Sequence, residues 1–461
     1  MNLVQTPNQV QVRRCPAGVL ASGAVLLFRQ FVNDDLGCAS YLVGDVQAGV
    51  AVVIDPAFAI EEYLTVAENE GVRVERVLET HTHADHVSGH GRFALEHGSP
   101  VAIHPLAEPE YPSEPLEDDQ VVEVGSVRIR VLHTPGHRPE HCSFVVDDAF
   151  ALTGDSMFVG AAARPDLAVA AREGAEDLFH SLRRLAGLGD GVQVYPGHVA
   201  GSLCGGHMSS ETSSTIGRER ATNDALQFRD VQEFVLVSAS VSTPRPPTTE
   251  RVVALNRGPW VARPGAPEEL AEPGAATVLD VRPFCAYSEG HIPGAISVPV
   301  EGSAFGTKAG FVLMAGERVV LHAGSEAEAA DAARKLWAVG ILEIAGYVTA
   351  PHAPETLATL DVAELRRLLD SPGLQLVDVR ETTERDSGYI PGSQNVPYRL
   401  LRKLGCGALD RSKPVVTVCE SGPRAAIAAS LLQREGFDVR AVADGGIADF
   451  ADTIAFRRCG A

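Results

Sequence analysis

Residues 80–90 read THTHADHVSGH, a stretch that holds three histidines and one aspartate between His81 and His86. In an extended segment, residues i and i+2 project to the same side, so His81 and His83 should point together. Asp85 and His86 should come around as the chain turns into a helix. The stretch therefore offers two sets of metal ligands, which two neighbouring metal ions could use.

Three loops further along the chain add candidate ligands, each after a short apolar strand. The segments VLHTPGH, FALTGDSMF and VQVYPGH supply His137, Asp155 and His198. Loops that follow the ends of strands can converge on one site. Because a strand followed by a candidate ligand recurs four times, a chance set of unrelated residues is a poor explanation. An ordinary core or surface position is the better interpretation of four other histidines, His90, His97, His104 and His180.

These residues resemble the ligand set of the metallo-β-lactamase superfamily. The HxHxDH motif of that superfamily corresponds to His81, His83, Asp85 and His86, and Asp55 in the segment VVIDP matches its early structural aspartate. The resemblance covers nearly the whole first domain. It implies an αββα sandwich, in which helices flank two stacked sheets.

The second half of the chain contains an internal repeat. VLDVRPFCAYSEGHIPGAISVP (278–299) aligns without a gap with LVDVRETTERDSGYIPGSQNVP (376–397), so that Asp280 pairs with Asp378 at an offset of 98. Each copy continues to a second apolar strand and then to an Ala-rich helix. Strands that alternate with helices favour an α/β fold with a parallel sheet.

The second copy carries a candidate nucleophile in the loop CESGPR. Cys419 follows a strand and precedes a helix, so backbone N–H groups, the helix N-terminus and Arg424 all favour a thiolate. The order of DVR, GYIPG and CxxGxR resembles the rhodanese sulfurtransferases. The resemblance implies that Cys419 carries sulfur as a persulfide and that the loop residues that follow it, Glu420, Ser421 and Gly422, cradle the substrate.

The first copy departs from that pattern. Ala323 stands opposite Cys419, and Glu328 stands opposite Arg424. We therefore interpret the first copy as a catalytically inactive, structural rhodanese-like domain. The expected boundaries are a metallo-β-lactamase-like domain, a Pro/Thr-rich linker, the inactive copy and the catalytic copy, over residues 1–241, 242–255, 256–352 and 353–461.

Composition excludes some partners. The 461 residues are 45% hydrophobic and 21% charged, as in ordinary soluble proteins. The net charge of -21 argues against nucleic acid and anionic membranes. No stretch reads as a signal peptide or a membrane span, so we expect a cytoplasmic protein whose eight cysteines are free thiols. The apolar content and the inactive copy of the repeat favour a homo-oligomer.

Two branches of the superfamily imply different reactions. In hydrolases of the glyoxalase II type, two zinc ions cleave a thioester, and all the required ligands are present. One metal would use His81, His83 and His137, the other would use Asp85, His86 and His198, and Asp155 would bridge them.

In the persulfide dioxygenase branch, one Fe(II) binds per chain. The resemblance assigns its ligands to His81, His137 and Asp155, a facial triad with open positions for a persulfide and O2. The remaining four candidates, His83, Asp85, His86 and His198, then orient the ligands or shuttle protons.

Three features favour the dioxygenase. A sulfurtransferase is fused in the same chain. The segment ARPDL resembles an Arg-x-Asp segment of persulfide dioxygenases, which makes Arg164 and Asp166 candidate substrate residues. The loop GSLCGGHMSS resembles one in dioxygenase–rhodanese fusions, where the residue corresponding to Cys204 handles persulfide; an incidental thiol is the competing interpretation.

The sequence thus predicts oxidation of a low-molecular-weight thiol persulfide to sulfite, coupled through Cys419 to the formation or use of thiosulfate, in sulfide detoxification. A third hypothesis is a scaffold protein in which both sites have decayed, against which the intact Cys419 loop and the full ligand set argue. The carrier thiol, the direction of sulfur transfer and the oligomeric state are left open.

Overall fold

The structure is a computed structural model that describes residues 3–5, 10–14, 25–199, 209, 211–240, 244–314, 316–349, 355–369, 371, 373–405, 407 and 409–450. It divides the chain into two compact units. The first comprises residues 1–264 and 337–340, and the second comprises residues 265–336 and 341–461.

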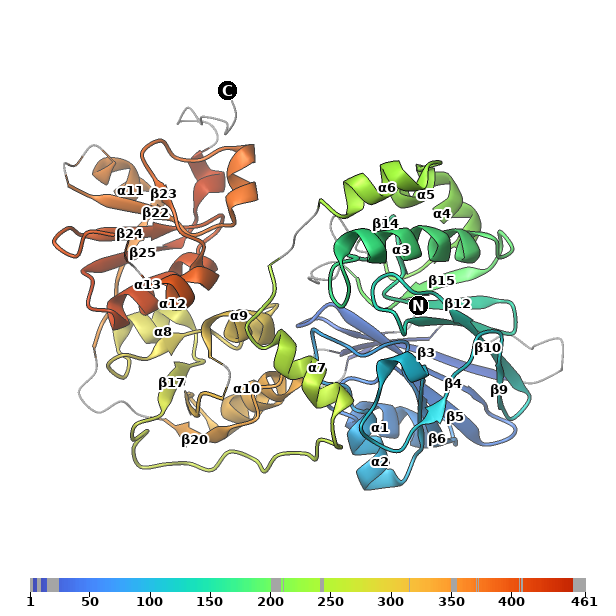
Figure 1. Ribbon diagram of the computed structural model, residues 1–461. Coiled ribbons are helices and arrows are strands. Elements are labelled where there is room, and N and C mark those ends of the chain that lie inside the picture. Colours follow the sequence, from blue (N-terminus) through green and yellow to red (C-terminus); the bar gives the residue numbers. More distant parts are fainter. Residues whose placement is uncertain are drawn as a thin grey trace. The chain divides into compact units, whose positions relative to one another are not determined.

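Two sheets form the centre of the first unit (Figure 1). The first sheet has eight strands in chain order: β1 Leu3–Gln5, β2 Val10–Arg14, β3 Leu26–Asn33, β4 Cys38–Asp45, β5 Val50–Ile54, β6 Arg73–Leu78, β7 Val101–Ile103 and β8 Glu114–Pro115. The second sheet has the order β16-β15-β12-β11-β10-β9, with bounds β9 Val121–Val124, β10 Val127–His133, β11 Cys142–Val146, β12 Phe150–Gly154, β15 Gln193–Pro196 and β16 Ser214–Thr215. A small hairpin adds β13 Met157–Phe158 and β14 Ala161–Ala162.

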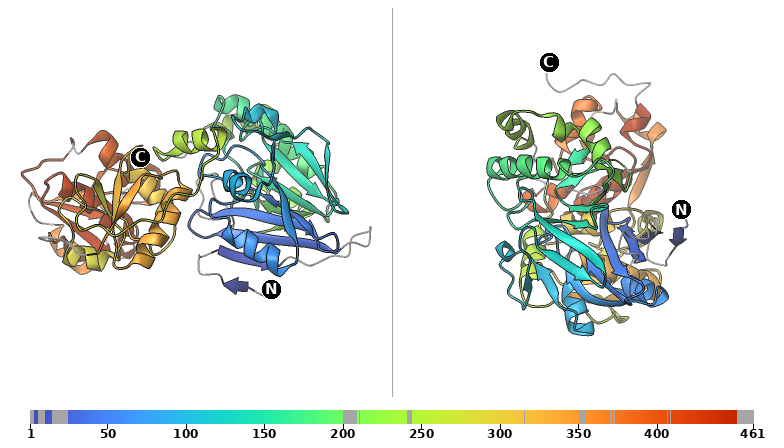
Figure 2. Two further views of the ribbon diagram at one scale, coloured as in Figure 1. Left: turned by 90° about the horizontal axis from the view of Figure 1, so that it is seen from below. Right: turned by 90° about the vertical axis from the view of Figure 1, so that its right-hand side faces the viewer.

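Helices cover the outer face of each sheet, which gives four layers (Figures 1 and 2). Helices α1 Glu61–Asn69 and α2 His90–His97 pack on the first sheet, and α3 Ala171–Ala186 and α6 Val231–Ser238 pack on the second. The unit also contains η1 Pro105–Ala107, α4 Ile216–Thr222, α5 Asp224–Gln227 and α7 Thr249–Arg257. The αββα sandwich expected from the sequence is therefore present.

Alternating side chains on the strands explain this layering. On β3, Phe28 enters the core between the two sheets, whereas Leu27 and Phe31 enter the core beneath α1 and α2. Between the sheets, the Phe28 ring lies 4.8 Å from the Tyr195 ring and 4.9 Å from the Phe150 ring, measured between centroids. Because a strand points successive side chains to opposite faces, a continuous apolar run serves both cores.

The second unit contains two parallel sheets, one for each copy of the repeat. The first copy has the order β18-β17-β19-β20 and the elements β17 Thr277–Asp280, α8 Phe284–Glu289, β18 Ile296–Ser297, α9 Phe305–Val312, β19 Val319–His322, α10 Glu326–Ala338 and β20 Ile344–Val348. The second has the order β21-β25-β24-β22-β23 and the elements β21 Ala358–Asp361, α11 Val362–Leu368, β22 Gln375–Asp378, η2 Thr382–Ser387, β23 Gln394–Asn395, η3 Tyr398–Leu400, α12 Leu401–Leu404, β24 Val415–Val418, α13 Pro423–Arg434, β25 Val439–Asp444 and η4 Ile447–Phe450.

The stretch interpreted as a linker, 242–255, overlaps helix α7, and the first unit extends to residue 264. Pro and Thr residues mask this helix in the sequence, because they precede it directly. The other domain boundaries stay a prediction.

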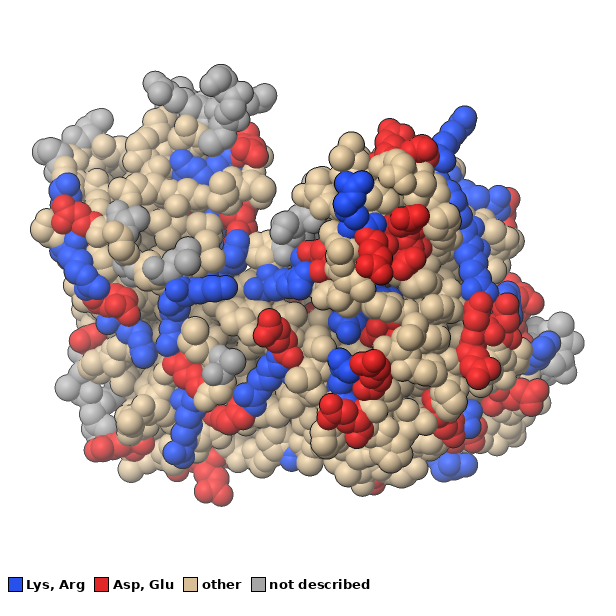
Figure 3. All heavy atoms as spheres, in the orientation of Figure 1, with Lys and Arg blue, Asp and Glu red and all other residues tan. Residues whose placement is uncertain are grey.

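Charged side chains of both signs are mixed on the face drawn in Figure 3. Ion pairs in the first unit include those of Arg184 with Asp118 and Asp119. Exposed pairs of this kind contribute little to stability. Among the described residues, no helix combines the length and the apolar character that crossing a membrane requires.

Candidate functional site

Three candidate ligands meet in the first unit where strands end. His81 follows β6, His137 follows β10, and Asp155 directly follows β12. Their candidate ligand atoms all lie within 4.8 Å of one another. Asp155 Oδ2 lies 3.4 Å from His137 Nε2 and 3.9 Å from His81 Nε2. The structure thus brings together the three residues that the sequence singled out as a triad.

The chemistry of this donor set fits a metal ion. His81 Nε2, His137 Nε2 and Asp155 Oδ2 are buried and have no hydrogen-bond partner among the described residues. Burial lowers the pKa of both histidines, so their rings are neutral and can donate a lone pair. Burial alone would raise the pKa of Asp155, but the facing His198 lowers it to about 2. Two imidazoles and one carboxylate are the ligands of a facial triad.

The two histidine ligands are each held from behind. The ring of His81 shares a hydrogen bond of 2.8 Å between Nδ1 and Thr80 Oγ1. Thr80 in turn donates from its backbone N–H and its hydroxyl to Asp55, over 2.7 and 2.8 Å. His137 Nδ1 donates to the carbonyl of Arg164 at 3.0 Å. Such partners fix ring orientation and leave Nε2 directed at the centre.

A second cluster of candidate metal ligands lies in the loop after β6, which also carries His81. Candidate atoms of His83, Asp85 and His86 lie within 4.8 Å of one another. His83 Nδ1 and His86 Nε2 are buried and lack a hydrogen-bond partner within the described part of the chain. The other ring nitrogen of His83 lies 3.1 Å from Glu79 Oε2. A second metal ion therefore has donors available here, as the hydrolase interpretation requires.

His198 connects the two clusters through both ring nitrogens. Nδ1 lies 2.7 Å from Asp155 Oδ1, and Nε2 lies 2.8 Å from Asp85 Oδ2. Burial would raise the pKa of Asp85, but His86 and His198 lower it well below its usual value. His198 is thus engaged by two carboxylates, which suits a group that orients the ligand Asp155.

Three residues at this site have no counterpart among the sequence predictions. Glu79, 1% exposed, accepts hydrogen bonds from Ser88 Oγ at 2.5 Å and from His90 Nδ1 at 3.1 Å. The neutral ring of His141, whose pKa burial lowers to about 3, accepts the backbone N–H of Asp155 at 2.9 Å. The third, Asn256, bonds to the motif loop from α7. Glu79 stands two residues before the motif, which is the one signal that could have marked it.

The predicted substrate residues of the first unit pair with each other. Arg164 donates from Nε and Nη2 to the carboxylate of Asp166, over 2.6 and 2.7 Å. Arg245 also contacts Asp166, at 3.2 Å. Cys204 lies outside the described residues.

The nucleophile loop of the second unit follows β24 directly. Cys419 is 1% exposed, and its Sγ accepts the backbone N–H of Gly422 at 3.1 Å. Gly422 has φ of +107°, and a Cβ there would lie 2.1 Å from the carbonyl oxygen of Ala443. Only glycine fits this turn. The turn leads into α13 and directs the N–H of Gly422 at the sulfur.

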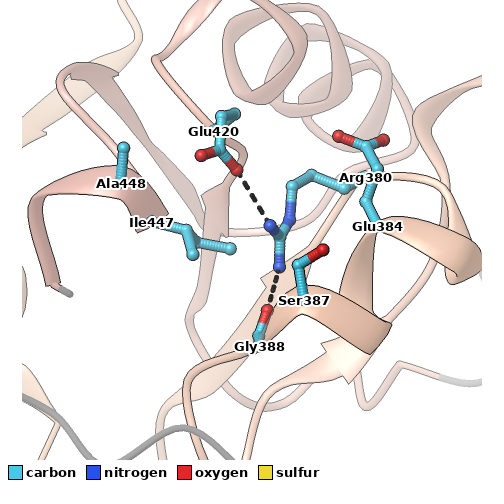
Figure 4. Close-up of a pocket in the computed structure, with 7 residues that line it drawn as sticks. All are labelled: Arg380, Glu384, Ser387, Gly388, Glu420, Ile447 and Ala448. Atoms are coloured by element: carbon cyan, nitrogen blue, oxygen red, sulfur yellow. Dashed lines mark hydrogen bonds and ion pairs between the residues drawn. The ribbon is translucent and has the colours of Figure 1, made fainter. Parts of the chain in front are cut away.

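Arginines around this loop are already paired with carboxylates. Arg424, expected from the sequence to face the sulfur, donates to both oxygens of Glu384 over 2.6 and 2.8 Å. Burial would lower the pKa of Arg424, but Glu384 and then Cys419 raise it. Arg380 donates to Glu420 at 2.8 Å, as Figure 4 shows. Arg380, Glu384 and Glu420 border a pocket of about 350 Å³, whose other lining residues are Ser387, Gly388, Ile447 and Ala448.

The corresponding loop of the first copy has no sulfur, because Ala323 stands opposite Cys419. Ala323 is fully buried, and Glu328 Oε2 accepts the backbone N–H of Gly324 at 2.5 Å. An N–H group of this loop is therefore occupied by the chain itself.

Known proteins match both units. Residues 33–198 match the metallo-beta-lactamase superfamily, and residues 266–350 and 361–453 match the rhodanese-like domain. The chain is 30% identical over 240 residues to the mitochondrial persulfide dioxygenase ETHE1 of Bos taurus, which covers 51% of this chain and 89% of that protein.

Two further comparisons bear on the fold and the reaction. A hydroxyacylglutathione hydrolase of Maricaulis maris is 30% identical over 178 residues, covering 38% of this chain and 66% of that protein. A metallo-beta-lactamase crystal structure from Staphylococcus aureus covers 72% of this chain and 99% of its own, with 28% identity and a TM-score of 0.66. The chain belongs to the metallo-beta-lactamase superfamily, as a homologue of the persulfide dioxygenase ETHE1 in which rhodanese-like domains follow the first domain.

Proposed function

We propose that the chain oxidises a low-molecular-weight thiol persulfide with O2 at one Fe(II) held by His81, His137 and Asp155. One persulfide, one O2 and one water give the free thiol, sulfite and two protons. The observation that carries this proposal is the set of three buried donor atoms, two imidazole nitrogens and one carboxylate oxygen, that converge without other partners among the described residues.

Fe(II) in this position would supply open coordination sites at which the persulfide and O2 meet. The protein's own groups hold and orient the ligands. Thr80 and the Arg164 carbonyl hold the two rings, and His198 keeps Asp155 ionised and oriented. The near-complete burial of the three ligands, each 1% exposed, keeps bulk water from the donor atoms.

We propose that Cys419 transfers sulfur in the same overall process. Its thiolate attacks the outer sulfur of a second persulfide, the S–S bond to the carrier breaks, and the carrier thiolate leaves with the electron pair. Attack by sulfite on the resulting Cys419 persulfide then gives thiosulfate and returns the thiolate. The Gly422 N–H stabilises the anionic sulfur. Concentrations in the cell decide whether the step forms or consumes thiosulfate.

We further propose roles for the first copy of the repeat and for Cys204, a location and an assembly. The first copy of the repeat, with Ala323 in its loop and Glu328 on α10, is a structural domain without sulfurtransferase activity. Cys204 takes part in persulfide handling. The protein acts in cytoplasmic sulfide detoxification and assembles as a homo-oligomer.

Metal content together with oxygen uptake tests the proposal. The purified chain should hold about one iron and consume O2 with a persulfide of glutathione, coenzyme A or cysteine. The second cluster, His83, Asp85 and His86, favours one alternative, a dinuclear zinc thioester hydrolase. Two zinc ions per chain, thioester cleavage and no oxygen uptake would establish that alternative.

A further inference from the structure

The loop between β6 and α2, residues 79–89, carries four of the candidate metal-centre residues but has no regular secondary structure. His83, His86 and Ser88 are 2–3% exposed, so water cannot serve their backbone groups. A buried backbone N–H or C=O without a partner costs as much as a lost hydrogen bond. The loop therefore needs partners from elsewhere in the chain to keep its shape.

Asn256, on helix α7, satisfies three of these backbone groups at once. Its Nδ2 donates to the carbonyls of His83 and His86, over 2.9 and 2.8 Å. Its Oδ1 accepts the N–H of Ser88 at 2.8 Å. The side chain is 3% exposed. A single rigid amide thus sets the spacing of three points on the loop, on both sides of Asp85.

The segment around Asn256 is itself fastened to the loop's surroundings. The ring of Trp260 stacks on Tyr111, with centroids 4.0 Å apart, and lies 5.6 Å from the ring of His90. The carbonyl of Arg257 accepts the N–H of Glu110 at 2.6 Å. Asn256 is therefore anchored well enough to define the loop instead of following it.

We infer that Asn256 is a positioning residue of the metal centre. It lies on a helix beyond the residues that match the superfamily, and it holds the ligand-bearing loop 81–88 in the shape that binds metal. This inference rests on the proposed metal site. α7 begins at residue 249, whereas the superfamily match ends at residue 198. The inference makes α7 part of the metal centre, although the sequence placed most of it in a linker.

Two substitutions separate the hydrogen bonds from the shape of the side chain. Asn256→Ala removes all three bonds. Asn256→Asp keeps the shape and the acceptor for Ser88, but it turns a carboxylate oxygen toward two carbonyl oxygens. Dissociation constants for Fe(II) and Co(II), from anaerobic chelator competition, should rise about 10–100-fold in both variants, as for other residues that orient ligands. The visible absorption of the Co(II) form should shift, because the ligand geometry changes.

Asn223→Ala is the matched control. Asn223 is fully buried, its Nδ2 also bridges two carbonyls, those of Phe158 and Ala161, and its Oδ1 also accepts a backbone N–H, from Ala225. It should destabilise the metal-free chain without changing metal affinity. Equal loss of affinity in the Asn223 and Asn256 variants, or wild-type affinity in Asn256→Asp, overturns the inference. Failure of the wild-type chain to bind metal would instead refute the proposed function.

A measurement without any variant covers the case in which Asn256→Ala does not fold. In the metal-free wild-type chain, the peptide that contains Ser88 should exchange its amide hydrogens slowly, because Asn256 already holds the loop. Protection that appears only after metal is added would overturn the inference, since the metal and not Asn256 would then order the loop.

Discussion

Replacing His198 with alanine should distinguish one metal ion from two. In the proposed mononuclear centre, His198 is not a ligand but donates to Asp155 and contacts Asp85, over 2.7 and 2.8 Å. Hydrogen bonds to charged groups are worth about 1.5–3 kcal/mol each. His198→Ala removes both bonds and leaves the buried Asp155 and the partly exposed Asp85 without their shared partner. The metal-free unit should therefore lose stability on the order of 3–6 kcal/mol.

The same change should weaken metal binding without changing its stoichiometry. Loss of a group that orients a ligand costs about 10–100-fold in affinity, or about 1.4–2.7 kcal/mol. The pH dependence should also shift. His198 holds the pKa of Asp155 at about 2 against burial. Without His198 the pKa of Asp155 rises. As the pH is lowered, the variant should therefore lose its metal at a higher pH than the wild-type chain does.

The assay is metal titration monitored by chelator competition at several pH values, with metal counted on the purified protein. His180→Ala is the control, because His180 is an exposed histidine on α3 of the same unit. A wild-type chain that binds two metals and a His198 variant that binds one would refute the mononuclear reasoning. A variant with wild-type affinity at every pH would refute the orienting role.

Three predictions concern the second unit. Cys419→Ser should abolish sulfur transfer and leave oxygen uptake intact, and loss of both activities would contradict the separation of the two sites. Gly422→Ala should destabilise its domain by about 1–3 kcal/mol in chemical denaturation, because φ is +107° and the new Cβ meets a carbonyl oxygen; an unchanged midpoint would contradict the packing. Burial alone would raise the pKa of Glu384, but its partner Arg424 lowers it below the usual value of 4.5. The ion pair therefore stabilises the domain above about pH 4.5, and this stabilisation is lost as the pH falls below that value. In chemical denaturation, Glu384→Gln should lose less stability than the wild-type chain as the pH falls through that range.

The repeat in the sequence predicted two similar sheets correctly, because the same local sequence pairs its strands in the same way. The offset of 98 reappears in the sheets, where Asp280 pairs with Ser297 and Asp378 pairs with Asn395. The arginine of each DVR segment donates to the aspartate of the same segment and to a carbonyl eight residues later, Arg282 to Gly290 and Arg380 to Gly388. Local sequence determines these contacts, so identical local motifs repeat them.

Contacts between distant segments could not be predicted in the same way. Asn256 lies about 170 residues from the loop that it holds, and nothing around it departs from an ordinary helix. Glu384 pairs with Arg424 across 40 residues, so the arginine that local spacing assigned to the sulfur is shared with a carboxylate. Such pairings depend on how the elements pack, and a single sequence carries no periodic signal for them.

In each copy of the repeat, an N–H group of the loop after the central strand donates to a side chain of the same copy. In the second copy, the loop N–H of Gly422 donates to the Cys419 sulfur, which leaves the group ready to stabilise a persulfide. In the first copy, the N–H of Gly324 donates to Glu328, a carboxylate of the chain's own helix. The two bonds use different N–H groups of the aligned loops, because Gly324 stands opposite Glu420 and not opposite Gly422. We therefore expect the residues in the loop, and not the fold that builds it, to decide whether a copy transfers sulfur.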